Sequence, residues 1–316
     1  MNRRQFLQST AVMAAATSAP AMAMHHAKDC GMANNTYGVQ AWMVRDSLAK
    51  SVPDTLAALE SVGITEMELF GFGAQGFESD KPLFNMSVDD LVAARDASNV
   101  RFPVGHLNGP VADVARAASI AKRLGCHTLI ESMAQELLSF ENGVPRLSIP
   151  KTLAEVDAIA ARLNGLGKQY AEHGLQFAYH NHHMEFAEVE GEVMYHYLIA
   201  KTDPALVKVE LDLGWAAAAG QDPVALIVQY GDRLVSTHMK DYDPSIPMPE
   251  NPSAQILIPE MVRLKPPGEG KSDFVGIVRE LNRLGVKHRF IEVDYTEAPI
   301  KDLATGYCNL SHIDRA

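Results

Sequence analysis

Residues 207–238 read VKVELDLGWAAAAGQDPVALIVQYGDRLVSTH. This stretch contains two short runs rich in valine and leucine, 207–212 and 234–238, and an amphipathic helical pattern, 223–230, between them. A strand, a helix and a second strand in this order form a βαβ unit, in which the two strands run parallel. The stretch therefore predicts a parallel sheet covered by helices.

The same alternation continues in both directions along the chain. Eight short β-rich runs stand at 37–43, 66–70, 102–106, 128–131, 176–180, 207–212, 234–238 and 289–293. Helical patterns occupy 53–62, 88–97, 111–124, 153–172, 192–200, 223–230 and 273–284. A C-cap glycine is expected where Gly63, Gly125, Gly174 and Gly285 each precede the next strand. Eight strands in 316 residues, without repeats or a composition break, predict an α/β fold with one (β/α)8 barrel, whose usual size is ~250 residues.

The alternative is a doubly wound open sheet. That fold usually carries a glycine-rich nucleotide loop after its first strand, and this chain has none there. Gly71-Phe72-Gly73 follows the second run without the rest of that fingerprint, so we interpret it as a turn. Two long connections, 133–150 and 240–271, follow the fourth and seventh strands. Both fall on the side where barrel active sites are built.

The first residues have the order of an export signal. They read MNRRQFLQSTAVMAAATSAPAMAM, with an arginine pair, a weakly apolar alanine-rich stretch and a small-x-small cleavage pattern. We predict a twin-arginine signal at 1–23, a flexible segment at 24–36 and the barrel at 37–316, in a protein exported to the periplasm. The signal contains two arginines and no acid, so cleavage changes the formal charge from −11 to −13.

Composition narrows the possible partners. The 39 acidic and 28 basic residues give an acidic surface that repels phosphate backbones, which disfavours nucleic-acid binding. Three cysteines allow one disulfide at most, and no CxxC pair supports a zinc ribbon or a thioredoxin-like site. No apolar run of transmembrane length follows residue 25, so we expect no stable membrane association after signal cleavage. An oligomer is possible.

From the third predicted strand onward, each strand ends in histidine or carboxylate. These residues are His106, Glu131, His180 with His182, Glu210 with Asp212, His238, and Glu292 with Asp294. The parallel strands of a barrel point the same way, so their tips meet at one mouth. Charged groups are rarely buried unless they are paired or bound to metal. The mixed N/O set therefore predicts a site for a divalent cation such as Mn²⁺, Co²⁺, Zn²⁺, Fe²⁺ or Mg²⁺.

Four motifs resemble a known family. They are YHNH at 179–182, LDLGW at 211–215, HMKD at 238–241 and IEVD at 291–294. Together they resemble the xylose-isomerase-like barrel superfamily of sugar isomerases, 3-epimerases and inosose dehydratases, often named sugar phosphate isomerase/epimerase. The resemblance covers roughly residues 37–296 and also includes GVQ at 38–40 and PGEG at 267–270.

The resemblance implies a metal held by one residue from each of strands five to eight, typically Glu, Asp, His and Glu. Asp212, His238 and Glu292 match the last three positions. The first position departs from the family. His180 is the favoured ligand there, with His182 as the other histidine offered and Glu131 as an oxygen donor from strand four.

A second departure concerns the substrate. Trp215 stands where epimerases carry a substrate-binding histidine, which shifts weight toward the dehydratase-like branch. The resemblance also implies that His106, Trp215 and Asn181 contact the substrate. Trp42 is a further candidate for stacking on a sugar ring. An exported enzyme rarely meets sugar phosphates, so we expect an unphosphorylated sugar, a keto-sugar or a keto-glycoside.

The implied chemistry is proton removal next to a carbonyl, with the metal stabilising the enediolate. Glu292 would serve as ligand and base, and His182, Glu131 or Glu185 as a second acid or base, while Lys240 would pair with the developing oxyanion. Isomerisation or epimerisation ranks first, and β-elimination by a lyase or dehydratase second. The remaining alternatives are a metal-dependent phosphodiesterase of the endonuclease IV type and a non-catalytic sugar-binding protein.

Overall fold

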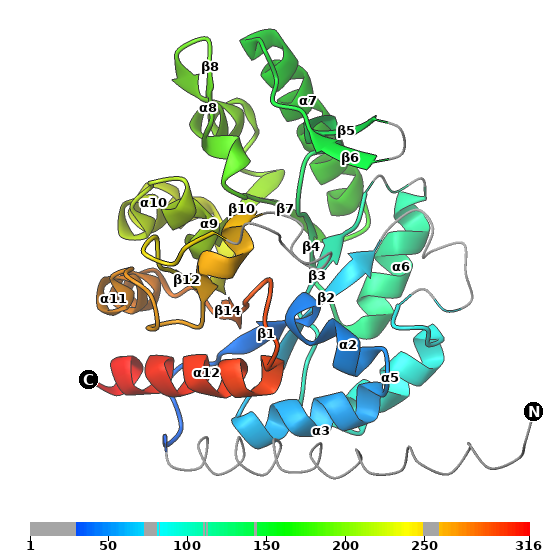
Figure 1. Ribbon diagram of the computed structural model, residues 1–316. Coiled ribbons are helices and arrows are strands. Elements are labelled where there is room, and N and C mark those ends of the chain that lie inside the picture. Colours follow the sequence, from blue (N-terminus) through cyan, green and yellow to red (C-terminus); the bar gives the residue numbers. More distant parts are fainter. Residues whose placement is uncertain are drawn as a thin grey trace, which may run out of the picture.

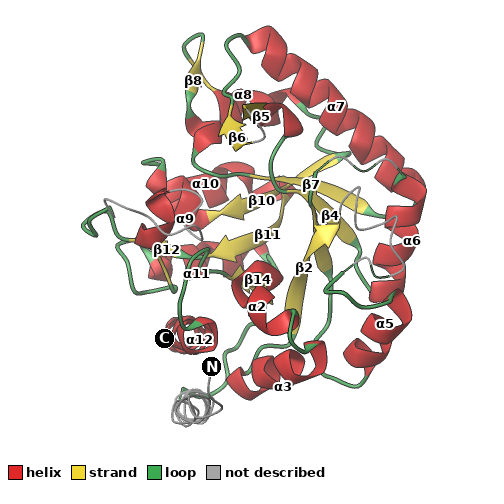
Figure 2. Ribbon diagram, turned by 45° about the vertical axis from the view of Figure 1, so that its right-hand side comes forward, coloured by secondary structure: helices red, strands yellow, loops and turns green. Residues whose placement is uncertain are grey.

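The computed structural model describes residues 30–72, 81, 83–109, 111, 113–141, 144–248 and 259–316. The predicted signal at 1–23 lies outside these residues. Eight parallel strands close into one barrel in the order β1-β14-β11-β10-β7-β4-β3-β2 (Figure 1). The helices lie outside the ring of strands (Figure 2). The prediction of a single (β/α)8 barrel is therefore confirmed.

Each predicted β-rich run overlaps one barrel strand, with ends that differ by up to three residues. The strands are β1 (Gly38–Gln40), β2 (Glu66–Phe72), β3 (Val104–Leu107), β4 (Thr128–Glu131), β7 (Gln176–His180), β10 (Val207–Asp212), β11 (Leu234–Met239) and β14 (His288–Ile291). Gly71 and Phe72, predicted as part of a turn, are instead the last residues of β2.

The described residues form ten α-helices. They are α2 (Arg45–Leu48), α3 (Val52–Val62), α5 (Val88–Asp96), α6 (Val114–Leu124), α7 (Leu153–Glu172), α8 (Met194–Lys201), α9 (Leu213–Ala218), α10 (Pro223–Tyr230), α11 (Phe274–Leu284) and α12 (Pro299–Arg315). Gly63, Gly125 and Gly285 are the expected C-caps, with φ of 99°, 93° and 70°. None of the described helices has both the length and the apolar character of a membrane span.

Seven of these helices follow the predicted patterns within a few residues, and the sequence patterns missed the short helices α2 and α9 and the long helix α12. Gly306 interrupts the pattern of α12, and the structure shows why a glycine stands there. A Cβ at this position would lie 2.7 Å from Pro267 Cδ, so only glycine lets α12 pack this closely.

Short hairpins and 3₁₀ turns lie between the strands and helices, all of them but the turn Gly231–Arg233 on the carboxyl side of a barrel strand. The hairpins are β5 (Leu138–Glu141) with β6 (Val144–Leu147), β8 (Glu188–Val189) with β9 (Glu192–Val193), and β12 (Asp241–Tyr242) with β13 (Leu264–Lys265). The 3₁₀ turns are η1 (Ala41–Val44), η2 (Gln135–Leu137), η3 (Met184–Phe186), η4 (Gly231–Arg233) and η5 (Pro259–Arg263). The two long connections thus contain hairpins of their own.

An apolar layer fills the middle of the barrel. It consists of Val104, Ile130, Ala178 and Phe290, all buried, with Val235 packed against them. The pairing of β10 with β11 shifts between Val209 and Glu210, which face Leu234 and Ser236, so Val235 is the extra residue of a bulge. Ser236 also turns inward, because its hydroxyl donates to Glu210. The bulge therefore sets which side chains of β11 face the interior beyond it.

The N-terminal segment is fastened to the C-terminal helix. Cys30 and Cys308 form a disulfide across 278 residues of sequence. Asn35 donates its backbone N–H to Asp314 Oδ2 at 2.7 Å. Residues 30–36, part of the segment predicted to be flexible, are therefore tied to α12. The sequence allowed one disulfide and did not say which cysteines form it.

Candidate metal centre and active site

A cavity of about 640 Å³ opens at the carboxyl ends of the barrel strands, where the sequence placed the site. Its polar lining includes three histidines of the strands, His106, His180 and His238, together with Glu292 and Asp294. Its other walls include Trp42, Phe70, Met133, Gln135 and Met261. Met133, Gln135 and Met261 come from the two long connections, so these loops do contribute to the cavity.

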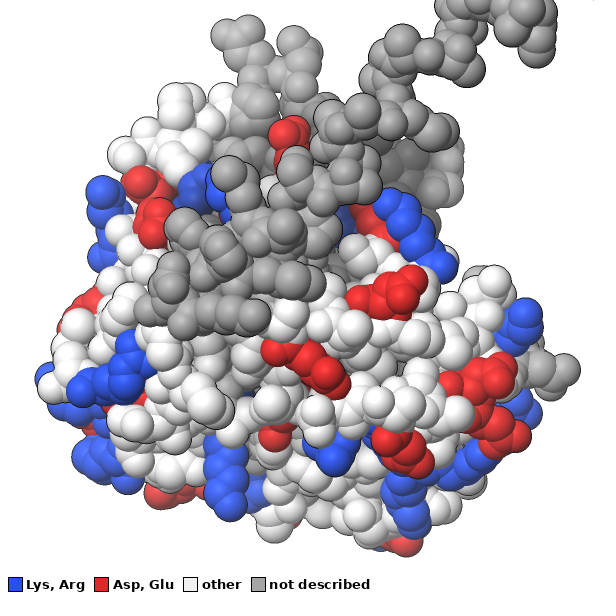
Figure 3. Space-filling view, turned by 90° about the horizontal axis from the view of Figure 1, so that it is seen from below, with Lys and Arg blue, Asp and Glu red and all other residues white. Residues whose placement is uncertain are grey.

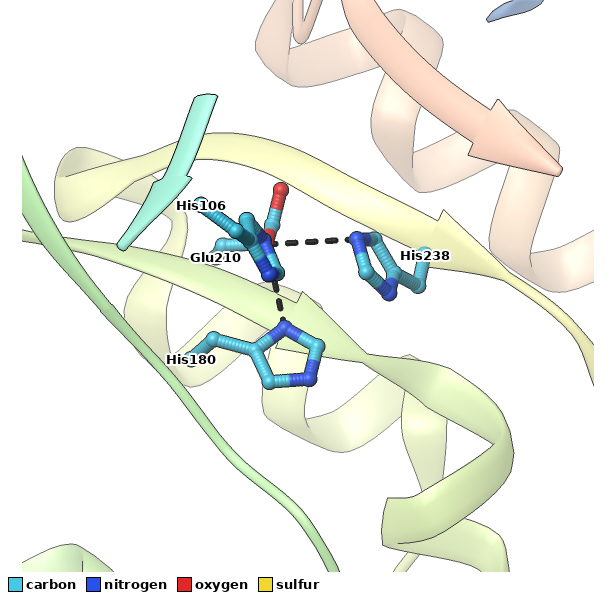
Figure 4. A group of neighbouring side chains, drawn as sticks. All are labelled: His106, His180, Glu210 and His238. Atoms are coloured by element: carbon cyan, nitrogen blue, oxygen red, sulfur yellow. Dashed lines mark hydrogen bonds and ion pairs between the residues drawn. The ribbon is translucent and has the colours of Figure 1, made fainter. Parts of the chain in front are cut away.

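Three imidazoles surround one buried carboxylate (Figure 4). Glu210 Oε2 lies 2.6 Å from His106 Nε2, 3.0 Å from His180 Nδ1 and 3.3 Å from His238 Nε2. Because the carboxylate oxygen itself occupies the centre of this group, the geometry is that of a hydrogen-bond hub.

A second buried carboxylate belongs to the same hub. Glu68 Oε2 lies 2.6 Å from His238 Nε2 and accepts a hydrogen bond of 2.7 Å from Gln40 Nε2. Glu68 Oε1 lies 3.2 Å from His106 Nε2. Glu68 and Glu210 are fully buried, and we call them the inner carboxylates.

The inner carboxylates raise the pKa of two of the three histidines around them. Burial alone would lower the pKa of His106, but Glu68 and Glu210 outweigh it and raise this pKa to about 9. Burial likewise opposes protonation of His238, and Glu210, Glu292 and Glu68 raise its pKa well above the ordinary value. The pKa of His180 is lowered instead, chiefly by burial and by the neighbouring His238.

Two further carboxylates face the other ring nitrogens of His180 and His238. Glu292 Oε2 is 2.9 Å from His238 Nδ1, and Asp212 Oδ2 is 3.5 Å from both His238 Nδ1 and His180 Nε2. We call Asp212 and Glu292 the outer carboxylates. The four residues predicted as metal ligands, His180, Asp212, His238 and Glu292, thus converge on one another.

This outer set fits a divalent metal. Ligands bound at about 2.0–2.2 Å from one ion lie roughly 3–3.5 Å apart, which is the spacing observed here. Asp212 Oδ2 and His238 Nδ1 are buried, and each has one close partner, Lys240 Nζ at 2.8 Å and Glu292 Oε2 at 2.9 Å. Asp212, His238 and Glu292 form a group in which one donor atom of each lies within 4.8 Å of the others. Such oxygen and nitrogen donors suit Mn²⁺, Co²⁺ or Zn²⁺.

Lys240 is buried among carboxylates beside this set. Its Nζ lies 2.8 Å from Asp212 Oδ2, 2.5 Å from Glu292 Oε2 and 2.6 Å from Asp294 Oδ2. Burial lowers and these three carboxylates raise its pKa, and the result is well above the ordinary value. Lys240 thus offsets part of the negative charge of these three carboxylates.

His182 lines the cavity next to the outer set. Burial and the neighbouring His180 lower its pKa well below the ordinary value, so its ring is neutral near pH 7. Its backbone N–H donates to Glu185 Oε2 at 3.0 Å, and its buried Nδ1 has no hydrogen-bond partner among the described residues. A neutral imidazole facing a cavity is a candidate general base.

Glu131 does not face the cavity. Side chains alternate along a strand, and its neighbour Ile130 belongs to the barrel interior, so Glu131 points outward. Arg162 of helix α7 donates to both of its oxygens, at 2.8 and 2.6 Å. The structure thus places this predicted acid or base, and alternative ligand, in an ion pair behind the barrel wall.

Three other residues predicted from the sequence do not line the cavity, and they make hydrogen bonds to residues of the site or to their neighbours. Asn181 donates to the carbonyl oxygen of Asp212 and accepts from its N–H, both at 3.1 Å. Trp215 packs with buried Met261, and its Nε1–H donates to Asp294 Oδ1 at 3.1 Å. Glu185 accepts from the Tyr179 hydroxyl at 3.0 Å. These three side chains were predicted to contact the substrate or to transfer protons. In the structure their polar groups make hydrogen bonds within the protein instead.

Some cavity and hub residues were assigned no role from the sequence, although Glu210 and Asp294 were named among the strand-end donors. Those without an assigned role are Gln40, Phe70, Asn108, Ser132, Gln135, Met261, Asp294 and the inner carboxylates Glu68 and Glu210. Alternation offered a signal for two of them, since Glu210 shares a strand face with Asp212, and Asp294 follows Glu292 by two residues. Glu68 stands within its strand rather than at the tip, so a search of strand ends passes over it.

Comparison with known proteins identifies the family. A model of the xylose isomerase-like TIM barrel matches residues 56–306. The chain belongs to this family. The inosose dehydratase of Bacillus cereus is 33% identical over 90 residues, which is 28% of this chain and 30% of that protein. The chain thus aligns with less than a third of that relative.

Solved structures of the same fold lie further away in sequence. A sugar phosphate isomerase/epimerase from Parabacteroides distasonis superposes with a TM-score of 0.69 at 19% identity, over 89% of this chain and 95% of that one. The IolI protein with a bound zinc atom gives a TM-score of 0.58 at 14% identity, over 88% and 96%. These likenesses concern the fold.

Proposed function

We propose that this protein is a divalent-metal-dependent enzyme that removes a proton next to the carbonyl of an unphosphorylated sugar or keto-sugar, as an isomerase or epimerase. The observation that carries the proposal is the outer donor set. His180, Asp212, His238 and Glu292 present donor atoms at ligand spacing beside a cavity of about 640 Å³. The zinc in the related IolI fold supports the same assignment.

The lining of the cavity supports a neutral substrate. No lysine or arginine stands among the described residues that line it. The segments 73–80, 142–143 and 249–258 contain none in their sequence either. A phosphate group is usually held by such cations or by a helix N-terminus. Trp42 offers an aromatic surface for the apolar face of a sugar ring.

The chain's own residues supply the proton transfers. When bound, a divalent metal supplies Lewis-acid stabilisation of the negative charge that forms on the substrate oxygens. Neutral His182 accepts or returns the proton at carbon, and Glu292 is the second candidate base. Lys240 holds Asp212, Glu292 and Asp294 in place and offsets part of their charge.

A lyase that eliminates water is the second candidate, because relatives named inosose dehydratase align with part of the chain. Asp294 lines the cavity between Lys240 and Trp215 and would protonate the leaving hydroxyl. Both reactions begin with the same enolate, so the site serves either one.

We also propose that the protein is exported through the twin-arginine route. The arginine pair and the cleavage pattern within 1–23 support this, and so does the Cys30–Cys308 disulfide, because disulfides persist in oxidising compartments. Twin-arginine export carries folded proteins, so the metal would be acquired before export and the disulfide formed after it.

The test combines elemental analysis of the purified exported protein with deuterium wash-in on a panel of free sugars and 3-keto-sugars. We expect about one divalent metal per chain, and solvent deuterium on carbon in at least one sugar. Product analysis then separates an isomer or epimer from an eliminated product. Metal with no deuterium on any sugar would contradict enolate chemistry. Sugar binding that survives EDTA would indicate a binding protein, and nicking of plasmid DNA with Mn²⁺ would indicate a phosphodiesterase.

A further inference from the structure

His238 lies between two pairs of carboxylates. Its Nε2 is 2.6 Å from Glu68 and 3.3 Å from Glu210, while its Nδ1 is 2.9 Å from Glu292 and 3.5 Å from Asp212. One edge of the ring therefore faces the inner carboxylates and the other faces the outer set.

His180 repeats the arrangement from the neighbouring side. Its Nδ1 is 3.0 Å from Glu210 Oε2, and its Nε2 is 3.5 Å from Asp212 Oδ2. His180 faces an inner carboxylate with Nδ1, whereas His238 does so with Nε2. What the two rings share is an inner carboxylate next to the nitrogen that points away from the outer carboxylates.

A histidine can bind a metal only through a nitrogen that carries no proton. The proton of a neutral ring must then sit on the other nitrogen, and an acceptor there fixes both the tautomer and the orientation of the ring. Glu68 and Glu210 are such acceptors. With a proton on His238 Nε2 and on His180 Nδ1, the bare nitrogens face Asp212 and Glu292.

The inner carboxylates are themselves held firmly. Gln40 donates to Glu68, Ser236 donates to Glu210 at 2.6 Å, and His106 lies within 3.2 Å of an oxygen of each. Both glutamates are fully buried, and they come from strands β2 and β10, on opposite sides of the barrel. This support gives each carboxylate a fixed position from which to orient a ring.

We infer that Glu68 and Glu210 are positioning residues: they hold His238 and His180 with the correct nitrogen turned toward the metal of the outer set. The inference rests on the proposed function. Neither glutamate touches the metal or the substrate in this assignment, so each acts through a histidine. His106 supports both glutamates, because its Nε2 lies within 3.2 Å of an oxygen of each.

The test is a titration of purified, metal-free protein with Zn²⁺ and with Mn²⁺, followed by calorimetry or chelator competition. Glu68→Gln and Glu210→Gln keep the shape of the side chain and remove its charge. We expect each to weaken metal affinity roughly 10–100-fold. Glu131→Gln is the matched control. It also neutralises a buried carboxylate of a barrel strand, but this side chain points out of the barrel, away from the metal ligands. Its metal affinity should equal that of the wild type.

A second measurement separates positioning from a merely structural role. Nitrogen-15 shifts of the histidine rings in the zinc-loaded wild type should show His238 bound through Nδ1 with a proton on Nε2, and the opposite for His180. In the two variants these ring signals should shift or exchange, while circular dichroism stays unchanged. Excess metal should restore part of the lost occupancy.

The outcomes distinguish this inference from the function on which it rests. Wild-type protein that binds no divalent metal overturns both. Wild-type protein that binds metal, with Glu68→Gln and Glu210→Gln variants that bind it within about twofold of wild type, overturns the positioning role alone. The opposite nitrogen on the metal in the wild type also overturns it.

Discussion

The two ends of the barrel hold similar residue types with different consequences. At the amino-terminal end, His127 and His288 have ring centroids 5.0 Å apart, and His288 Nδ1 lies 2.9 Å from Glu66 Oε2. At the carboxyl end, the rings of His106, His180 and His238 lie 4.5 to 5.2 Å apart around the inner carboxylates. The apolar layer of the barrel interior separates the two groups.

The pKa values of the histidines differ between the two ends because the ends differ in burial and in the number of nearby carboxylates. His127 is exposed, and burial of part of its ring together with His288 lowers its pKa. At the carboxyl end, buried glutamates raise the pKa of His106 and His238 instead. Water solvates the amino-terminal group, whereas the carboxyl-terminal group must balance its charges internally. A histidine next to a carboxylate is therefore not enough to indicate a metal site. Several nitrogen and oxygen donor atoms must also meet in a place from which water is excluded. Acidic and basic side chains also lie side by side over the protein surface (Figure 3), where solvent screens them.

The largest expected effect is the loss of metal from the outer set. Asp212→Ala and His238→Ala should each abolish bound metal and lower activity by about 10²–10³-fold or more, because the charge of the enolate is then unopposed. The barrel should remain folded. Elemental analysis, activity and circular dichroism measure the three effects. Glu66→Gln, at the amino-terminal end, is the matched control and should retain its metal. Near-stoichiometric metal in the Asp212→Ala, His238→Ala double variant would contradict the ligand assignment.

His182→Gln should separate proton transfer from metal binding. We expect kcat to fall about 10²–10⁴-fold, because the neutral ring that faces the cavity no longer moves a proton. Metal content should stay at the wild-type level. Rates of deuterium incorporation, with elemental analysis beside them, measure both quantities. An unchanged exchange rate would remove His182 from the mechanism and leave Glu292 as the base.

Glu131→Ala should affect stability without affecting the metal. Arg162 would lose the partner that binds it through two hydrogen bonds, so we expect the free energy of unfolding to fall by about 1–3 kcal/mol. Urea denaturation measures this change, and chelator competition measures the metal affinity. A Glu131 variant with normal stability but without metal would place this carboxylate at the site after all.

The smallest effect is expected at the amino-terminal end. Because the pKa of His127 is lower in the folded protein than in the unfolded chain, protonation favours unfolding. Stability should therefore decline as pH falls below the ordinary histidine pKa of about 6.5, and His127→Gln should make this decline slightly smaller. Urea denaturation at pH 7 and pH 5 tests the difference. A variant that loses more stability at pH 5 than the wild type would reverse the assigned sign.

Local pattern predicted most of the fold and part of the site. Each of the eight barrel strands overlaps a predicted run, because the pattern of a strand is local to a few residues. Asp212, His238 and Glu292 were predicted for the same reason, since each stands at or just after the end of a strand, and the structure brings them together. Glu131 also stands at a strand tip, yet it points outward, because its inward neighbour Ile130 fixes the alternation of that strand.

The sequence by itself determined the barrel, the end at which the site lies and the kinds of donor atom present there. Only the tertiary structure decided which carboxylates meet which ring nitrogens. Glu68 and Lys240 come within 2.6 Å of site residues because barrel closure and strand register bring distant strands together. The bulge at Val235 and the Cys30–Cys308 disulfide are decided in the same way. These are contacts between residues far apart in sequence, and local patterns carry no information about them.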